Sequence, residues 1–250
     1  MKKLFVVTSL LMVFMVVPMA MADQVMVYRV GGYYSGNGGE FTLGIVGTGT
    51  PDLDINWALY SSNTRNIGTN NPSFQSFCVE TDEYVNVPGG PYNVVLNNSA
   101  EAGGSGGPSP DPLSVGAAWL YHEFQLGRLS GYNYTPGTDP NNVDLREASA
   151  GALQTMIWYL EDEIASPNWQ NTTNPFASVL FSQFTDYTNA KKDNYLFGKY
   201  PVAVLNLYDG TTLKQDQLVC VPAVPEPATM LLLGSGLIGL AGFARRRFKR

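Results

Sequence analysis

Residues 144–165, DLREASAGALQTMIWYLEDEIA, form the longest clean helical pattern in the chain. Apolar residues recur along this stretch at steps of three and four, which is the spacing of a helix that packs one face against a core. The residues of this predicted stripe are Leu145, Ala148, Ala152, Met156, Leu160 and Ile164. The stretch therefore predicts a core helix, which Pro167 closes.

One amide in this helix is oddly placed. Gln154 lies off the apolar stripe, with small residues one turn before it and Trp158 one turn after it. A neighbouring backbone can therefore come close to this face of the helix. We predict that this neighbour is the strand SFCVE, residues 76–80, and that Cys78 meets Gln154.

The first third of the chain has the pattern of β-strands. Between residues 24 and 96, apolar and polar residues alternate over short runs that Gly, Pro and Asn separate, which is typical of an antiparallel sheet with one solvated face. The predicted strands are QVMVYRV (24–30), EFTLGIV (40–46), INWALY (55–60), FQSFCVE (74–80) and YNVVL (92–96). Residues 97–112, NNSAEAGGSGGPSPDP, have the composition of a flexible loop.

Helices are predicted in the middle of the chain. Asp111 and Pro112 suit the N-cap and first turn of a helix at 112–126, whose core face holds Leu113, Ala117, Leu120 and Phe124. A weaker helix is predicted at about 175–189, with Phe176, Leu180, Phe184 and Tyr187 on one side, and a final hairpin around Gly210. Residues 23–221 are thus predicted to be an α+β domain, an antiparallel β-sandwich or barrel-like sheet with a helical insertion at about 112–190.

Composition excludes some classes of function. The 250 residues, 44% of them hydrophobic, are enough for one sizeable core. The formal net charge is −6, and an acidic surface repels the phosphates of nucleic acid, so we expect no nucleic-acid partner. One His cannot assemble a histidine-rich metal site, and we expect neither a metal nor another cofactor.

Residues 1–22 have the features of a secretory signal peptide. Two Lys residues precede an apolar run at 4–17, and the small-residue pattern Ala20-Met21-Ala22 follows it. This order predicts cleavage after Ala22, and an uncleaved anchor helix is the alternative. The protein is therefore expected to work outside the cytoplasm.

The tail at 222–250 carries the most specific motif. It begins with Pro225, Glu226 and Pro227, continues with an apolar stretch at 228–244, and ends in RRRFKR with Arg245, Arg246 and Arg247. This order resembles the PEP-CTERM sorting signal of Gram-negative bacteria that have an exosortase. The resemblance implies a transient inner-membrane anchor, processing by the exosortase, and delivery to the outer surface or the exopolysaccharide matrix.

There are two cysteines, Cys78 and Cys220. In an exported protein the default expectation is one disulfide bond between them. Cys220 lies beside the sorting signal, whereas Cys78 follows Phe77 in an aromatic strand. Both a disulfide and another role for Cys78 are therefore open.

The pair Phe77-Cys78 in a β-rich region, followed by Gln154 and Trp158 on a later helix, resembles the internal thioester domain of Gram-positive surface adhesins. In that family the cysteine thiolate attacks the glutamine side-chain amide, ammonia leaves, and a thioester joins the two segments. The resemblance implies that Cys78 supplies the sulfur and Gln154 the acyl group, with Phe77 and Trp158 flanking the bond. It also implies covalent capture of an amine on a target.

His122 is the only imidazole in the chain. One hypothesis makes it a general base that deprotonates Cys78 or the incoming amine. Its predicted place on a helix, opposite the core stripe, is more typical of a solvent-facing residue. The acidic residues Glu80, Asp82 and Glu83 follow Cys78 and are expected to form a solvated strand end.

We therefore predict an exported cell-surface or matrix adhesion protein that captures amine-bearing targets through a thioester between Cys78 and Gln154. Capture occurs once per molecule, so we expect no enzymatic turnover. The alternative is a noncovalent structural or carbohydrate-binding module of the biofilm matrix, in which aromatic side chains stack on sugars; the candidates are Tyr33, Tyr34, Trp57 and Tyr60. A third hypothesis, ranked lower, is a hydrolase or acyltransferase that uses Cys78 and His122.

Overall fold

The computed structural model describes residues 24–46, 73–105, 108–137, 144–164, 174–194 and 199–221. The predicted signal peptide, the predicted strand at 55–60 and the predicted sorting tail lie outside these ranges. Within the described part, no helix combines the length and the apolar character that crossing a membrane requires.

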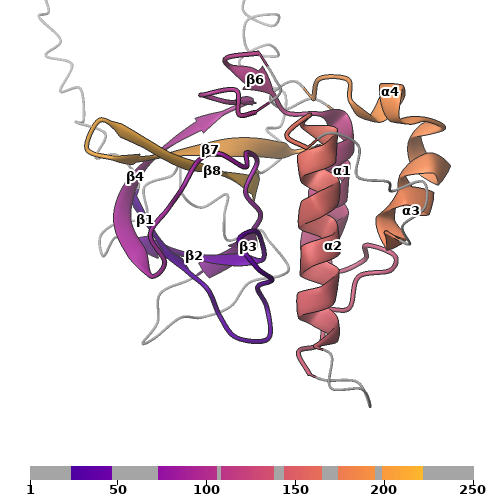
Figure 1. Cartoon of the computed structure of the whole chain (residues 1–250), viewed down its shortest axis with the longest axis horizontal. Coiled ribbons are helices and arrows are strands. Elements are labelled where there is room, and N and C mark those ends of the chain that lie inside the picture. Colours follow the sequence, from indigo (N-terminus) through magenta and orange to yellow (C-terminus); the bar gives the residue numbers. More distant parts are fainter. Residues whose placement is uncertain are drawn as a thin grey trace, which may run out of the picture.

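Six strands form one antiparallel sheet in the order β3-β2-β1-β4-β7-β8 (Figure 1). They are β1 Gln24–Tyr28, β2 Phe41–Val46, β3 Ser73–Ser76, β4 Gly89–Asn97, β7 Val202–Asp209 and β8 Thr212–Cys220. The sheet curls into a half-barrel. Of the two predicted architectures, the barrel-like sheet is therefore the one that the described strands adopt.

The segment after β3 joins the two edges of the curled sheet. The N–H of Val79 donates to the carbonyl oxygen of Asp216 on β8 at 3.0 Å, and Cys78 lies opposite Gln217 in an antiparallel bridge. Residues 77–79 therefore pair with β8 at the point where the curled sheet closes.

Apolar clusters lie on both faces of the curled sheet, which explains why β7, with the sequence VAVLNLYD, is so apolar. One cluster draws side chains from all six strands, including Val25, Phe41 and Leu205, and this convergence is possible only on the concave side of the curl. The other joins Val204 and Leu218 to the buried faces of the helices. Strands that are buried on both faces need nearly continuous apolar runs.

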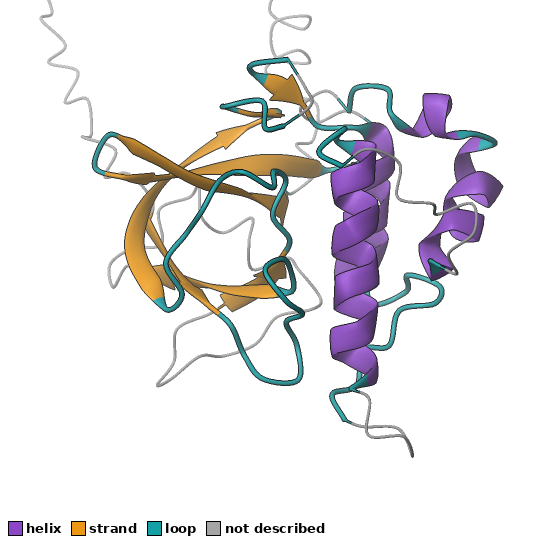
Figure 2. Cartoon of the chain, viewed as in Figure 1, coloured by secondary structure: helices purple, strands orange, loops and turns teal. Residues whose placement is uncertain are grey.

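The helices lie outside the half-barrel, in the chain between β6 and β7 (Figure 2). They are α1 Val115–Gln125, α2 Leu145–Leu160, α3 Pro175–Phe184 and α4 Tyr187–Ala190. α1 packs on β7 and β8, α2 packs beside α1, and α3 and α4 lie on the side of this pair away from the sheet. The predicted core residues of α1 are all buried.

The start of α1 corrects the sequence prediction. Asp111 and Pro112 do not cap a helix; they form strand β6 (Asp111–Pro112), which pairs with β5 (Ser99–Ala100). The N-cap is Ser114, whose hydroxyl accepts a hydrogen bond from the N–H of Ala117 at 3.1 Å. The prediction of a plain loop at 97–112 is wrong at these strands, because the loop composition hides a two-stranded ladder.

The predicted stripe on α2 is partly wrong. Met156 and Leu160 are buried, but Leu145 is 39% exposed and Ala148 is exposed as well. The reason is that α2 is covered on two sides, by the half-barrel and by the other helices, so a single apolar stripe does not describe its burial. The helix also ends at Leu160, well before Pro167.

The predicted third helix is two helices. Thr185 has a positive φ of 72°, a conformation that ends α3, and the Asp186 side chain then caps α4 by accepting from the N–H of Asn189. The predicted apolar side is otherwise present, since Phe176, Leu180 and Phe184 are buried.

A buried ion pair joins the half-barrel to α2. The guanidinium of Arg146, at the start of α2, donates to both carboxylate oxygens of Glu40 at 2.6 and 3.0 Å, and neither side chain is more than 4% exposed. The Tyr132 hydroxyl donates to the same carboxylate at 2.6 Å, and the Arg146 guanidinium stacks on the Tyr33 ring at 3.9 Å. These contacts hold the residues just before β2 against the helix.

We expect Arg146→Leu to lower the free energy of unfolding by about 3 to 5 kcal/mol, because it leaves the Glu40 carboxylate buried without a partner. Urea denaturation followed by circular dichroism measures this change. Arg128→Leu is the matched control, because Arg128 pairs with Glu123 at an exposed site and its loss should change stability little. Equal effects of the two substitutions would contradict a structural role for the buried pair.

Candidate functional site

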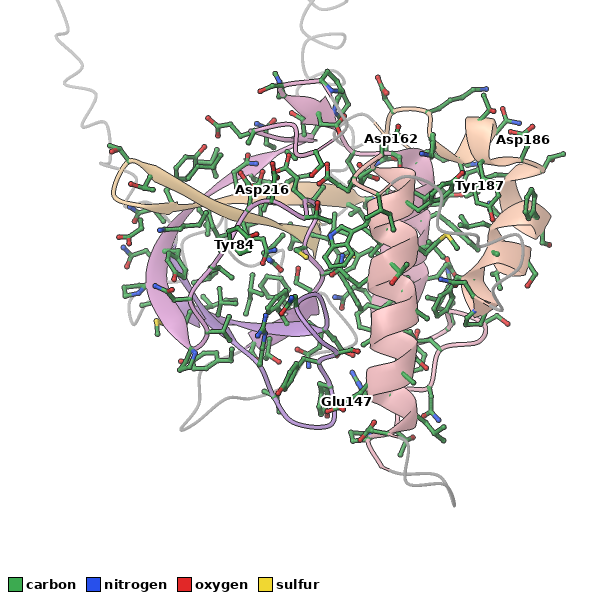
Figure 3. All side chains as sticks on the ribbon, viewed as in Figure 1. Tyr84, Glu147, Asp162, Asp186, Tyr187 and Asp216 are labelled. Carbon is green, nitrogen blue, oxygen red and sulfur yellow. The ribbon has the colours of Figure 1, made fainter. Side chains whose placement is uncertain are left out.

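A loop before β2 makes close contact with α2. A Cβ on Gly38 would lie 2.3 Å from Cγ of Gln154, and a Cβ on Gly151 would lie 2.7 Å from the hydroxyl of Ser35. The N–H of Gly32 donates to Glu147, labelled at the start of α2 in Figure 3, at 2.9 Å. The small residues beside Gln154 therefore admit this loop at 35–39, which the sequence analysis did not identify as the neighbour.

Cys78 and Gln154 are in contact across the boundary between the half-barrel and the helices. The Cys78 sulfur lies 3.3 Å from Oε1 of Gln154, and Nε2 of Gln154 donates to the Cys78 carbonyl oxygen at 2.8 Å. Cys78 is fully buried and Gln154 is 1% exposed. The predicted strand 76–80 therefore is a neighbour of this amide, together with the loop at 35–39.

Two backbone donors converge on the carbonyl oxygen of the Gln154 side chain. Its Oε1 accepts from the N–H of Gly39 at 2.8 Å and from the N–H of Cys78 at 3.1 Å. A pair of fixed N–H groups on one carbonyl oxygen is the arrangement that stabilises negative charge when a nucleophile adds to the carbonyl carbon. The nucleophile nearest to that oxygen is the Cys78 thiol.

Burial raises the pKa of the Cys78 thiol to about 12, and the indole N–H of Trp158, the backbone N–H groups of Cys78 and Gly39, and the charge of Arg29 oppose this rise. The Trp158 N–H is close enough to the sulfur to act on its pKa, but it makes no hydrogen bond of good geometry among the described residues. This donor is buried and without another partner among the described residues, so it is placed to serve a sulfur that gains negative charge. The resting group is a thiol.

The two predicted flanking aromatics have different positions. Trp158 packs against the concave cluster that contains Cys78. Phe77 points the opposite way, into the cluster between sheet and helices, where its ring meets Phe124 edge to face with centroids 5.1 Å apart. A Cβ on Gly39 would lie 2.1 Å from the Phe77 ring, so Phe77 supports the backbone that donates to Gln154.

His122 belongs to a different neighbourhood. Its Nδ1 lies 3.7 Å from the Glu123 carboxylate, and its ring centroid lies 6.1 Å from that of Tyr200. Burial lowers its pKa, an effect that the Glu123 charge opposes. The contacts described for His122 include neither Cys78 nor Gln154.

Cys78 and Cys220 are both free thiols. Cys220 pairs with Val202 on β7 and packs against the cluster on the helix side of the sheet, whereas Cys78 lies in the concave cluster. Burial raises the pKa of Cys220 to about 12. The default expectation of a disulfide is therefore not what the structure contains.

The sequence did not predict the loop at 35–39 or the two backbone N–H groups that donate to the Gln154 oxygen. The signal was present as Gly38-Gly39, a pair that allows a backbone to approach another chain closely. The acidic cluster after Cys78 was also misjudged, because Glu80 is 1% exposed and not part of a solvated strand end. Tyr33 and Tyr34 are half-buried, and Trp57 and Tyr60 lie outside the described residues.

We expect Gly38→Ala to lower the free energy of unfolding by about 1 to 3 kcal/mol, because the new methyl group overlaps the Gln154 side chain. Gly31→Ala is the matched control, since a Cβ there meets nothing within 4 Å. Urea unfolding of both variants measures the difference. If Gly38→Ala is as stable as Gly31→Ala, the loop does not press on Gln154 as described.

Comparison with known proteins identifies the tail. The model of the PEP-CTERM protein-sorting motif matches residues 223–247. No curated protein and no solved structure matches the chain. The match contains the predicted motif residues, which are Pro225, Glu226, Pro227, Arg245, Arg246 and Arg247. The sorting motif indicates an exported protein of the Gram-negative type that is associated with the extracellular matrix and processed by an exosortase.

Proposed function

We propose that this exported protein is a surface or matrix adhesin that captures amine-bearing targets through an internal thioester between Cys78 and Gln154. One observation carries the proposal: the Cys78 sulfur and two backbone N–H groups, of Gly39 and Cys78, all meet the same carbonyl oxygen of Gln154. A buried Gln that only fills space needs hydrogen-bond partners, but it does not need a thiol among them.

Formation of the thioester needs no reactant other than the Cys78 thiol and the Gln154 amide, and its products are the thioester and ammonia. The Cys78 sulfur adds to Cδ of Gln154, and the carbonyl oxygen takes the negative charge between the N–H groups of Gly39 and Cys78. The Cδ–Nε2 bond then breaks, and the thiol proton leaves with the amide nitrogen as ammonia. The hydrogen bond from Nε2 to the Cys78 carbonyl oxygen fixes the plane of the Gln154 amide before attack. The amide therefore does not have to rotate to meet the sulfur.

The second step is the capture itself. An amine nitrogen adds to Cδ of the thioester, the sulfur leaves as the thiol of Cys78, and an amide bond joins Gln154 to the target. Sulfur donates less electron density to the carbonyl than nitrogen does, so the thioester is the more reactive acyl group. The complete burial of Cys78 keeps water from this bond before a target arrives.

The other hypotheses receive less support from the contacts. A Cys–His hydrolase needs the imidazole within hydrogen-bond reach of the thiol, and the contacts of His122 are with Glu123 and Tyr200. A noncovalent matrix module is compatible with the sorting motif. It gives no reason for the Cys78 thiol beside the Gln154 carbonyl oxygen, and we therefore keep it as the outcome that follows if the thioester is absent.

We expect the purified protein to be lighter by one ammonia than the mass calculated from its own sequence, and methylamine to add once at Gln154. Intact-mass measurement and peptide mapping test this. The Cys78→Ala and Gln154→Ala variants should have full mass and add no methylamine, because each lacks one partner of the bond.

Cys220→Ala is the matched control and should keep the loss of ammonia, as should His122→Ala. A deficit of two hydrogens that vanishes in both cysteine variants would identify a disulfide instead. Either that deficit or the full mass in freshly purified protein would refute the thioester.

We expect Trp158→Phe to slow methylamine capture on the order of 10-fold or more, because the departing sulfur loses the indole N–H donor, and a hydrogen bond to a charged group contributes about 1.5 to 3 kcal/mol. Tyr159→Phe is the matched control, because Tyr159 contacts Tyr187 and Lys191 on another side of the helix. Mass spectra recorded over time give the rates of methylamine capture by the two variants. An unchanged rate in a folded Trp158→Phe variant would exclude this role.

A further inference from the structure

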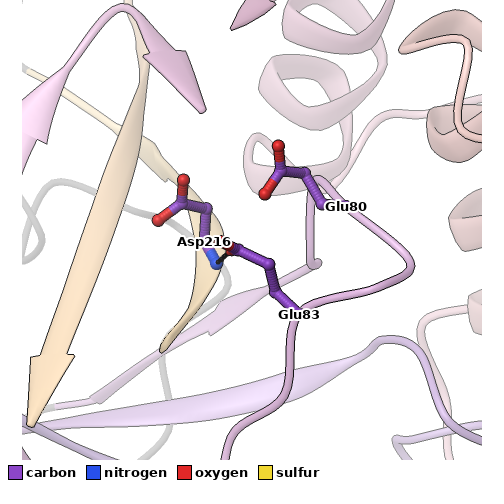
Figure 4. Close-up of side chains that lie close together, drawn as sticks. All are labelled: Glu80, Glu83 and Asp216. Atoms are coloured by element: carbon purple, nitrogen blue, oxygen red, sulfur yellow. Dashed lines mark hydrogen bonds between the residues drawn. The ribbon is translucent and has the colours of Figure 1, made fainter. Parts of the chain in front are cut away.

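Three carboxyl groups meet beside the closure of the half-barrel. Oxygen atoms of Glu80, Glu83 and Asp216 lie within 4.8 Å of one another. Figure 4 shows the Glu80 side chain reaching toward Asp216 and the Glu83 carboxylate beside the backbone N–H of Asp216. Two of the residues come from the segment after Cys78 and the third comes from β8.

The hydrogen bonds of the cluster leave several buried oxygens without a donor. Glu80 is 1% exposed, no N–H or hydroxyl group donates to either of its carboxylate oxygens, and the side chain that it meets is the Glu83 carboxyl. Asp216 is fully buried; its Oδ2 accepts from the N–H of Glu101 and from the Asn206 amide, at 2.9 and 2.8 Å, while its Oδ1 has no partner. Glu83 accepts from the N–H of Asp216 at 3.1 Å.

No cation among the described residues balances these charges. The ion pairs of the described chain involve other acids. Burial is the main cause that raises the pKa of all three carboxyls, and repulsion between neighbouring acids adds to it. Buried carboxylates are normally paired with a positive group or bound to a metal ion, because an isolated buried charge is costly.

We propose that Glu80, Glu83 and Asp216 form a binding site for a divalent cation of the hard, oxygen-preferring class, with Ca²⁺ as the best-suited ion. Carboxylate oxygens are the ligands that Ca²⁺, Mg²⁺ and Mn²⁺ prefer. Ca²⁺ binds oxygen at about 2.3 to 2.6 Å, so ligands on opposite sides of one ion can be about 5 Å apart. Mg²⁺ needs shorter bonds in a stricter octahedron and gives up its water reluctantly.

The position of the site predicts what the ion does. Glu80 and Glu83 lie on the segment that leaves Cys78, and Asp216 lies on the strand whose carbonyl receives the Val79 N–H. A bound ion therefore holds this segment to β8 and stabilises the closure of the half-barrel. The inference needs no thioester, since it depends on the three carboxylates alone.

The test is a calcium titration of the full-length protein after treatment with EDTA. Binding at the millimolar to submillimolar affinity of extracellular calcium modules predicts a rise in Tm of about 3 to 10 °C in about 10 mM CaCl2, and a smaller rise in MgCl2. Isothermal titration calorimetry should give about one ion per chain. No rise in Tm together with no binding heat for the unaltered protein would overturn the site.

Glu80→Gln keeps the shape of a side chain whose oxygens accept no hydrogen bond, so the variant should fold and lose at least about 10-fold in calcium affinity. Glu83→Gln should lose affinity as well. Asp82→Asn is the matched control, because Asp82 is exposed between them and its loss removes the same charge. An equal loss of calcium affinity in Asp82→Asn and Glu80→Gln would mean that calcium responds only to the net acidic charge of this region. That result would overturn the proposal.

Discussion

The side-chain amide of Gln154 joins the two halves of the molecule. It accepts from the backbone N–H groups of Gly39 and Cys78 and returns one hydrogen bond to the Cys78 carbonyl, so α2, the loop before β2 and the segment after β3 meet at one amide. All of these groups are buried, where an unmade hydrogen bond is costly. The surrounding packing therefore has to hold three segments in one arrangement.

The segment after β3, residues 77–80, contributes side chains to both apolar clusters and to the acidic cluster. Successive side chains of an extended chain point to opposite sides, so Phe77 and Val79 enter the cluster next to the helices while Cys78 enters the concave cluster. Glu80 then reaches the acidic cluster. Pairing with β8 keeps this alternation in register, because a slip of one residue would exchange the two sides.

Much of the fold was readable from local patterns. The strands of the six-stranded sheet, the core face of α1 and the hairpin at Gly210 follow from alternation, helical spacing and turn residues. The errors lie where long-range packing decides. Leu145 is exposed because α2 buries other faces against neighbours on two sides, and Ser114 starts α1 because the residues before it pair with β5.

By itself, the sequence determined the sorting tail, the α+β class and the pairing of Cys78 with Gln154 as candidates, because these depend on short motifs and periodic patterns. Only the tertiary structure decided that Gly39 aims its N–H at the Gln154 oxygen, that Arg146 reaches Glu40, and that three acids gather at the barrel closure. Each of these contacts joins residues far apart in the chain. Local sequence patterns do not predict such contacts, because the curl of the sheet and the packing of α2 bring these residues together.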